Sequence, residues 1–262
     1  MAVSTTKLSE PLRSDDPMSV RDYVIYAPHD GNMLAWMRLM SVLRTGEPSF
    51  LAATGFEVWA YFNEHPDIGA RFNRAMTSLA AGTNRMVLQA YDFSPFKTLV
   101  DVGGGQGLLL ATILNTHPHL RGALFDLPAV ADGARNYVHA QGLADRCDVL
   151  PGNAFESIPR GYDAYIMKNV LHDWSDEKAL LLLKQCRAAI PDHGKLIIVD
   201  AVMVPGNEPH PSKWFDVHMM VALGGRERTE VEFRTLLTAA RFRVTMAKSL
   251  PAPIGIVEAT PC

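Results

Sequence analysis

The chain has 262 residues, of which 48% are hydrophobic and 20% are charged. This composition excludes a disordered polymer and supplies enough apolar surface for one full α/β domain with a smaller appendage. The net charge of -3 lacks the basic surplus with which proteins neutralise nucleic-acid phosphates, so we expect no nucleic-acid partner.

The cysteines and the apolar runs of the sequence indicate the cell compartment of the protein. Cys147, Cys186 and Cys262 are far apart and form no CxxC pair, so we expect neither a disulfide framework nor a metal site. The chain has no run of about 18 apolar residues, and its polar N-terminus lacks the apolar core of a signal peptide. We therefore expect a cytoplasmic protein that has free thiols and does not bind membranes.

The first third of the chain, residues 1–90, is predicted to be a helical N-terminal segment. It begins with a polar lead-in over residues 1–17, which we expect to be extended or frayed. Beyond the lead-in, apolar residues recur at helical spacing. Pro48 and Pro66 divide this region into separate helices, and the stretch from Asn73 onward is predicted to be one long helix.

Residues 91–262 are predicted to form a second domain, because short β-branched, apolar runs alternate with helical stretches there. The predicted strands are residues 97–102, 122–126, 146–150, 162–167, 194–200, 242–247 and 254–259. The predicted helices are residues 108–117, 129–141, 176–190 and 229–240, with Ser175 capping the third. A proline-rich turn should join the last two strands in a hairpin. The pattern predicts an α/β fold with a doubly wound, mostly parallel, seven-stranded Rossmann-like sheet.

The strongest local signal is the segment Val100-Asp-Val-Gly-Gly-Gly-Gln-Gly107, which follows a predicted strand and opens a predicted helix. Glycines let the backbone turn sharply and let a ligand approach it closely. In doubly wound sheets, nucleotide-type ligands bind at this edge, beyond the carboxyl ends of the strands. The loop is therefore predicted to bind a cofactor.

Two cofactors compete for this loop. A dinucleotide fingerprint needs glycine at its first, third and sixth positions, and neither Gly103 nor Gly104 as a starting point gives that pattern. S-adenosylmethionine has no phosphate, and its sulfonium and ammonium cations suit the nearby Asp101. The carboxylate of Asp126, at the end of the next strand, is placed to accept the ribose hydroxyls. The segment therefore favours S-adenosylmethionine.

Five segments of the chain, including the glycine loop and the strand end with Asp126, resemble the O-methyltransferase family. This family includes plant caffeic acid and flavonoid methyltransferases and bacterial polyketide-tailoring enzymes. The five segments occur in the family's order across most of residues 60–262. The matching segments are residues 100–107, PheAspLeuPro at 125–128, GlyAsnAlaPhe at 152–155, LysAsnValLeuHisAspTrp at 168–174 and GlyGlyArgGluArgThr at 224–229.

The resemblance implies roles at the matching positions. The cofactor would be bound by Asp101, Gly103, Gly104, Gly105, Asp126, Leu127, Asn153, Ala154, Phe155 and Lys168. His172 matches the family's general base, and Asp200 and Glu227 match the acidic residues that orient it. Phe72 and Met76 resemble a stretch that touches cofactor and acceptor.

Trp214 and Met219 are further candidates for acceptor contacts. They lie on an expected helix with an apolar set of side chains, which is either core or pocket lining. No metal ligand set accompanies them.

The sequence departs from the family at several points. Asn153 stands where the family usually has Asp, and Asp200 is shorter than the usual Glu by one methylene. The family also carries a winged-helix dimerisation module before the segment that begins here at Lys7, and this sequence starts at the tail of that module. We therefore expect any homodimer to be weakened.

The residues around His172 suit methyl transfer to a hydroxyl oxygen. Transfer from a sulfonium is an in-line displacement, so alignment of the reacting atoms carries much of the rate. A phenol has a pKa of about 10 and is mostly protonated at pH 7, and a neutral histidine can remove that proton. Either Asp200 or Glu227 could fix the imidazole tautomer. The predicted reaction is O-methylation of a small aromatic acceptor, phenolic or polyketide-like, in secondary metabolism.

Other functions and plainer roles remain open at this point. The glycine spacing opposes a nicotinamide oxidoreductase, and the lack of an Asn/Asp-Pro-Pro-aromatic tetrapeptide opposes a nucleic-acid methyltransferase. A protein that binds the cofactor without catalysis stays an alternative. His172 could instead cap a helix, Asp200 could be a turn carboxylate, Glu227 a solvated charge and Lys168 a surface lysine.

Overall fold

The computed structural model describes residues 5–16, 19–250 and 254–262. The chain divides into two compact units. The first comprises Met1–Arg85 and Val221–Leu223, and the second comprises Met86–Met220 and Gly224–Cys262. Two helices, α6 (Pro66–Ala90) and α10 (Pro211–Ala222), contribute residues to both units.

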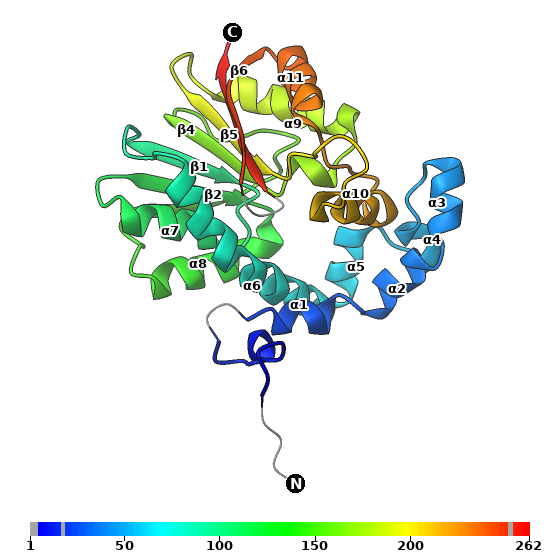
Figure 1. Ribbon diagram of the computed structural model, residues 1–262. Helices are drawn as coiled ribbons and strands as arrows, with labels where there is room; N and C mark the ends of the chain where they lie inside the picture. Colours follow the sequence, from blue (N-terminus) through cyan, green and yellow to red (C-terminus); the bar gives the residue numbers. More distant parts are fainter. Residues whose placement is uncertain (1–4, 17–18, 251–253) are drawn as a thin grey trace. The chain divides into compact units, whose positions relative to one another are not determined.

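The described part of the first unit is helical (Figure 1). Its elements are η1 (Glu10–Leu12), α1 (Arg21–Tyr26), α2 (Asp30–Trp36), α3 (Leu39–Thr45), α4 (Phe50–Thr54), α5 (Val58–Glu64) and most of α6. The expected lead-in is wrong in part, because a 3-10 turn forms around Pro11; residues 1–4 and 17 lie outside the described residues. The long helix starts at Pro66 rather than Asn73, because proline fits the first turn of a helix.

The second unit contains a seven-stranded sheet in the order β3-β2-β1-β4-β5-β7-β6. Strands β1 to β5 are parallel, whereas β7 is antiparallel to both β5 and β6. The strands are β1 (Thr98–Val102), β2 (Arg121–Asp126), β3 (Cys147–Pro151), β4 (Ala164–Lys168), β5 (Lys195–Asp200), β6 (Phe242–Ser249) and β7 (Gly255–Pro261). The predicted doubly wound, seven-stranded sheet is confirmed.

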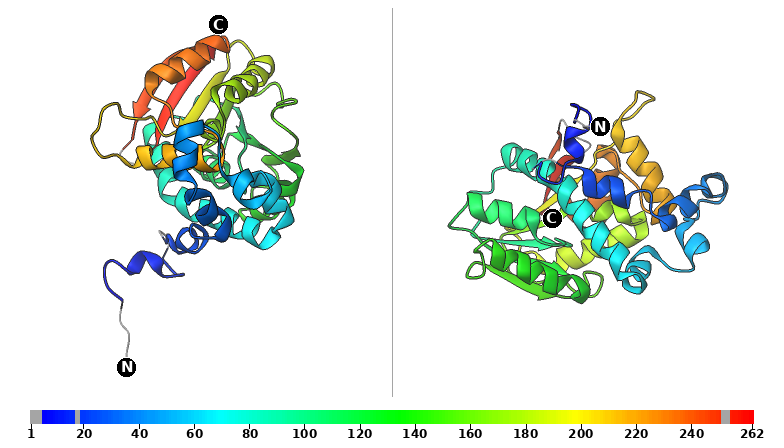
Figure 2. Two further views of the ribbon diagram at one scale, coloured as in Figure 1. Left: turned by 90° about the vertical axis from the view of Figure 1, so that its right-hand side faces the viewer. Right: turned by 90° about the horizontal axis from the view of Figure 1, so that it is seen from below.

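Helices cover both faces of this sheet, as Figures 1 and 2 show. The helices of the second unit are α7 (Leu108–Thr116), α8 (Pro128–Ala140), η2 (Leu171–Asp173), α9 (Asp176–Ala189) and α11 (Glu230–Ala239). Successive side chains of a strand point to opposite faces, so each strand serves two cores. On β1, Val100 and Val102 pack with α9 and α11, whereas Leu99 packs with α7 and α8.

The element boundaries differ from the expected ones by one or two residues at most ends. The fourth strand starts at Ala164 rather than at residue 162, because Asp163 turns its carboxylate to accept the backbone N–H groups of Lys97 and Thr98. Ser175 caps α9 as predicted, accepting from Lys178 N at 3.4 Å. The proline-rich turn at 251–253 lies outside the described residues.

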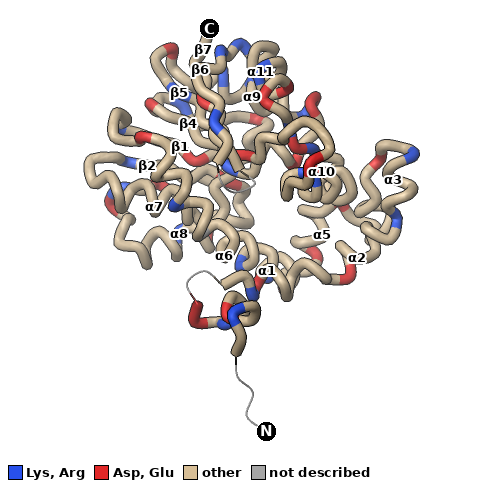
Figure 3. Tube along the Cα trace, in the orientation of Figure 1, with Lys and Arg blue, Asp and Glu red and all other residues tan. Residues whose placement is uncertain are grey.

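Acidic and basic residues are interspersed along the trace, with no long stretch of one sign (Figure 3). None of the described helices is both long and apolar enough to cross a membrane.

Candidate active site

Parallel strands bring the predicted site residues to one edge of the sheet. Asp101 lies near the end of β1, Lys168 ends the adjacent β4, and Asp200 ends β5. Asn169 then takes a left-handed conformation with φ of 54°, which asparagine tolerates, and turns the chain into η2. His172 lies on η2, directly beyond this edge.

The glycine loop between β1 and α7 needs residues without side chains. Gly103 has φ of 72°, and a Cβ there would lie 2.8 Å from Cγ2 of Val170. Gly105 also has a left-handed φ, of 59°, but a Cβ there would meet no atom within 4 Å. The loop therefore packs tightly against the segment that leads to His172 on one side and leaves open space for a ligand at Gly105.

Asp101 and Lys168 lie next to this loop and interact through their charges. Asp101 is only 1% exposed, and neither of its carboxylate oxygens has a hydrogen-bond partner among the described residues. Burial raises the pKa of Asp101 to about 7, against the opposing effect of Lys168. Burial likewise lowers the pKa of Lys168, which Asp101 and Asp200 oppose. A buried carboxylate without a partner fits a ligand that brings a positive charge.

Asp126 at the end of β2 is held in place by the backbone. Its Oδ2 accepts the N–H of Gly105 at 2.8 Å, and its Oδ1 accepts that of Leu127 at 2.7 Å. Each carboxylate oxygen has further lone pairs, so the group can still accept hydroxyl protons from a ligand. The side chain of Leu127 is exposed beside it. This arrangement suits a ribose, and no dinucleotide glycine pattern accompanies it.

The side chain of Asn153 is engaged locally. Its Oδ1 accepts the N–H of Phe155 at 3.0 Å, and its Nδ2 donates to Glu156 at 3.1 Å. These bonds form a turn after β3 that also carries Ala154. The ring of Phe155 meets the ring of Trp174 edge to face at 4.8 Å, so the turn is joined to the segment that follows His172.

His172 and Glu227 form a close pair. Nδ1 of His172 lies 2.9 Å from Oε1 of Glu227, and both side chains are largely buried. A carboxylate can only accept, so in the neutral imidazole the proton sits on Nδ1 and Nε2 keeps the free lone pair. Nε2 is therefore the nitrogen that can accept a proton from a ligand.

Two further carboxylates face the imidazole. Oδ1 of Asp173 lies 3.4 Å from Nε2 of His172, a contact that the sequence did not single out. Asp200 is 1% exposed and has no hydrogen-bond partner among the described residues, so it acts on His172 through its charge. Burial raises the pKa of Asp200 to about 7. Of the two carboxylates expected to orient His172, Glu227 makes the hydrogen bond.

These charges dominate the protonation of His172. Burial alone would lower the pKa of the imidazole, but the hydrogen bond to Glu227 and the charges of Asp173, Glu227 and Asp200 outweigh it. The net effect raises the pKa of His172 to about 10. The imidazole is therefore a strong base for its type.

The loop that carries Glu227 is itself fixed by a residue that the sequence did not single out. Oδ1 of Asp216, on α10, accepts the backbone N–H of Glu227 at 2.9 Å. Nothing in the sequence pairs these residues, which are 11 positions apart on different elements.

The four residues predicted to contact an acceptor lie in different surroundings. Phe72, on α6, stacks on Phe62 at 4.8 Å within an aromatic cluster of the first unit, and Met76 lies one turn further along, half-buried. On α10, Trp214 is 74% exposed whereas Met219 is buried. Their spacing of five residues places these two side chains on different sides of the helix.

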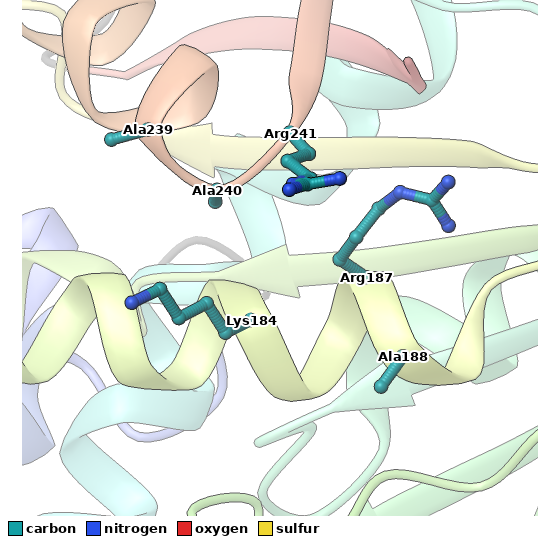
Figure 4. Close-up of a pocket in the computed structure, with 6 residues that line it drawn as sticks. All are labelled: Lys184, Arg187, Ala188, Ala239, Ala240 and Arg241. Carbon is teal, nitrogen blue, oxygen red and sulfur yellow. The ribbon is translucent and has the colours of Figure 1, made fainter.

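One cavity of the second unit is lined by none of the predicted site residues. A cavity of about 310 Å³ lies between α9 and the end of α11 and is lined by Lys184, Arg187, Ala188, Ala239, Ala240 and Arg241 (Figure 4). It contains none of the predicted site residues and no carboxylate. Within the described residues, no three His, Cys, Asp or Glu side chains are arranged to hold a metal ion.

The fold and the glycine loop define the class of Rossmann-like methyltransferases. Comparison with known proteins gives the family: the model of the O-methyltransferase domain matches residues 36–243, and the chain belongs to this family of S-adenosylmethionine-dependent O-methyltransferases. The prediction of S-adenosylmethionine rather than a dinucleotide is thereby confirmed, as is the resemblance drawn from the motifs.

Individual relatives are similar over nearly the whole chain. A phenazine O-methyltransferase of Lysobacter antibioticus is 40% identical over 256 residues, which cover 98% of this chain and 75% of that protein. The crystal structure of LaPhzM has a TM-score of 0.94 at 39% identity and covers 99% of this chain and 78% of its own. The O-methyltransferase NcsB1 from neocarzinostatin biosynthesis was solved with S-adenosylmethionine and 2-hydroxy-5-methyl naphthoic acid. It has a TM-score of 0.88 at 29% identity over 99% of this chain and 78% of that one.

Proposed function

We propose that this protein transfers the methyl group of S-adenosylmethionine to a hydroxyl of a small aromatic metabolite, with His172 as the general base. The observation that carries the proposal is the 2.9 Å contact between His172 and Glu227 at the sheet edge that also bears the glycine loop. This contact gives the neutral imidazole one tautomer, in which Nε2 carries the lone pair.

The cofactor would be held by residues of the second unit. Asp101 and Lys168 would face the charged amino-acid end of the cofactor. The backbone of the Gly103–Gly105 loop would lie against the cofactor, and Asp126 would accept hydrogen bonds from its ribose. Leu127, Ala154 and Phe155 would contact the adenine, and Asn153 would support them through its hydrogen bond to Phe155 N. When bound, this cofactor supplies an electrophilic methyl group on a sulfonium.

His172 would take the proton of the acceptor hydroxyl on Nε2. Glu227 stabilises the imidazolium that forms, since its Oε1 accepts from Nδ1 in both protonation states. The pKa of His172, raised to about 10, is close to that of a phenol at about 10, so proton transfer between them costs little. Asp173, which contacts Nε2 at 3.4 Å, must yield that position to the acceptor.

The proposed acceptor is a phenol on a fused or substituted aromatic ring. Two similar proteins support this class: one is named for phenazines, and the other was solved with a hydroxylated naphthoic acid. Phe72, Met76, Trp214 and Met219 are the proposed acceptor contacts. A homodimer stays part of the proposal.

The test is methyl transfer from S-adenosylmethionine to a panel of hydroxylated phenazines and naphthoic acids, followed by mass spectrometry. We expect a methyl gain with the wild-type protein and a loss of about a hundredfold or more in rate with His172→Asn. Binding of S-adenosylhomocysteine, measured by calorimetry, should stay within about twofold, because the variant leaves the glycine loop and Asp126 unchanged.

Two results would contradict the proposal in different ways. Full turnover by His172→Asn would remove His172 as the base while leaving the enzyme class intact. Cofactor binding without methylation of any panel member would instead favour the alternative of a cofactor-binding protein without catalysis.

A further inference from the structure

Arg228 is buried to an unusual degree for an arginine. It is 1% exposed and ranks among the largest fully buried side chains of the described chain. Charged side chains are almost never fully buried unless they are paired. Arg228 directly follows Glu227 and precedes Thr229, the N-cap of α11. Its side chain therefore extends from the loop next to the His172–Glu227 pair.

The guanidinium of Arg228 binds the turn that carries His172. Its Nη1 donates to the carbonyl of Leu171 at 2.8 Å, and its Nη2 donates to that of Trp174 at 2.9 Å. These two carbonyls flank His172 and Asp173 on either side. Nε donates to Oδ1 of Asp176 at 2.9 Å, which supplies the compensating charge at the start of α9.

The backbone of the same loop contacts the same turn. Arg226 N donates to the carbonyl of His172 at 2.9 Å. A Cβ on Gly225 would lie 2.0 Å from that carbonyl oxygen, so only glycine allows the two backbones to approach this closely. The carbonyl of Arg228 in turn accepts from Met203 N at 2.8 Å, just after β5. The loop is thus fixed to the sheet and bonded to three carbonyls of the turn.

We propose that Arg228 is a positioning residue that holds the imidazole of His172 against Glu227 by clamping the 171–174 turn onto the loop that carries Glu227. This inference rests on the proposed function of His172 but concerns a residue that does not touch the imidazole. Arg228 fixes both partners of the His172–Glu227 pair. It is the chain neighbour of Glu227, and its guanidinium donates to the carbonyls on both sides of the His172–Asp173 segment.

Only a guanidinium suits this task. Its five N–H donors lie in a rigid planar fork and can bond two carbonyls and a carboxylate at once. A lysine would keep the positive charge beside Asp176 but presents its donors from a single nitrogen. Arg228→Lys therefore removes the set of hydrogen bonds to the turn while it keeps the positive charge beside Asp176.

The first readout does not depend on activity. The imidazole of His172 is titrated by NMR in the protein saturated with S-adenosylhomocysteine. The groups that face it are Asp173 on η2, Glu227 on the loop before α11 and Asp200 at the end of β5. In Arg228→Lys we expect the pKa of His172 to fall from its raised value, because a looser turn lengthens the contact with Glu227.

The second readout is turnover. A displacement of the base by about 1 Å can cost up to about a hundredfold in rate, so we expect kcat of Arg228→Lys to fall about tenfold or more. The KM for S-adenosylmethionine should stay within about twofold, because the glycine loop is untouched. Arg234→Ala, which removes an exposed arginine paired with Glu230 on α11, serves as the control and should leave pKa and kcat at wild-type values.

The outcomes decide the inference even if a variant is unstable or the enzyme assay fails. Should Arg228→Lys not fold, Asp176→Asn removes the exposed charged partner of Arg228 and should shift the pKa of His172 in the same direction. A folded Arg228→Lys with the wild-type pKa and kcat would overturn the proposal, even if its melting temperature fell. If no acceptor is methylated, the NMR titration still tests the clamp.

Discussion

Two carboxylates of the site, Asp101 and Asp200, are buried without hydrogen-bond partners among the described residues. Both oxygens of Asp101 and both of Asp200 lack a partner among the described residues, as does Oε2 of Glu227. Burial of an unpaired charge is costly, and a carboxyl group escapes that cost by keeping its proton. The raised pKa values of Asp101 and Asp200, each about 7, follow from this. These groups therefore change charge near neutral pH.

The ionisation of Asp101 should make cofactor binding depend on pH. Its folded-state pKa of about 7 lies above the unfolded value of about 3.9. Its contribution to stability is therefore present below about pH 4 and lost as the pH rises to about 7. A cationic ligand favours the ionised form, so affinity should increase as the pH rises through 7.

Asp101→Asn should abolish this pH dependence and weaken binding of S-adenosylmethionine about tenfold or more at pH 8, since a charge-assisted hydrogen bond is lost. Calorimetry between pH 6 and 8 measures both effects. Asp132→Asn, at an exposed carboxylate on α8, is the control and should bind as wild type does. An unchanged affinity profile in Asp101→Asn would mean that Asp101 does not face the cofactor's charge.

Among the elements of the fold, the glycine loop borders both the proposed cofactor space and the segment that carries His172. It packs on Val170, which lies two residues before His172, and it also borders the open space at Gly105. A change in the loop should therefore disturb both cofactor binding and the base, whereas a change at Gly142, which has no atom near its added methyl, should affect stability alone.

Gly103→Ala tests this coupling. The added methyl would lie 2.8 Å from Val170 at a φ of 72°, so we expect strain of about 1–3 kcal/mol and cofactor affinity at least about tenfold lower. Gly142→Ala is a matched control, with φ of 69° and no atom within 4 Å of the added methyl. It should lose stability from backbone strain but keep affinity and rate. Equal losses of affinity in the two variants would refute the role of the Val170 contact.

The sequence predicted the elements well where local patterns decide them. The alternation of apolar residues with helical stretches and the glycines after Val102 act over short distances, so the number of strands and their places along the chain followed from them. The strand ends depend on tertiary contacts, such as the bonds of Asp163 to Lys97 and Thr98, 66 and 65 residues away. No local pattern encodes such contacts.

At the scale of the whole molecule, the site depends on residues that meet only in the folded second unit. His172 and Glu227 are 55 positions apart, and Arg228 reaches Leu171 across 57. The sequence Arg226-Glu-Arg228 looks like a solvated charge run, so the burial of Glu227 and Arg228 could not be distinguished from exposure. Family resemblance gave Glu227 its role, and nothing in the pattern gave one to Arg228 or Asp173.

The central claim is that the imidazole held by Glu227 accepts the proton of the acceptor. It is tested most directly by the pH dependence of kcat/KM for wild type and Glu227→Gln, with one phenolic acceptor. Because His172 has a raised pKa of about 10, the wild-type rate should increase about tenfold per pH unit between pH 7 and 9. In Glu227→Gln the midpoint should move to lower pH, and the maximal rate should fall because the base is weaker. Identical midpoints in the two proteins would contradict the claim.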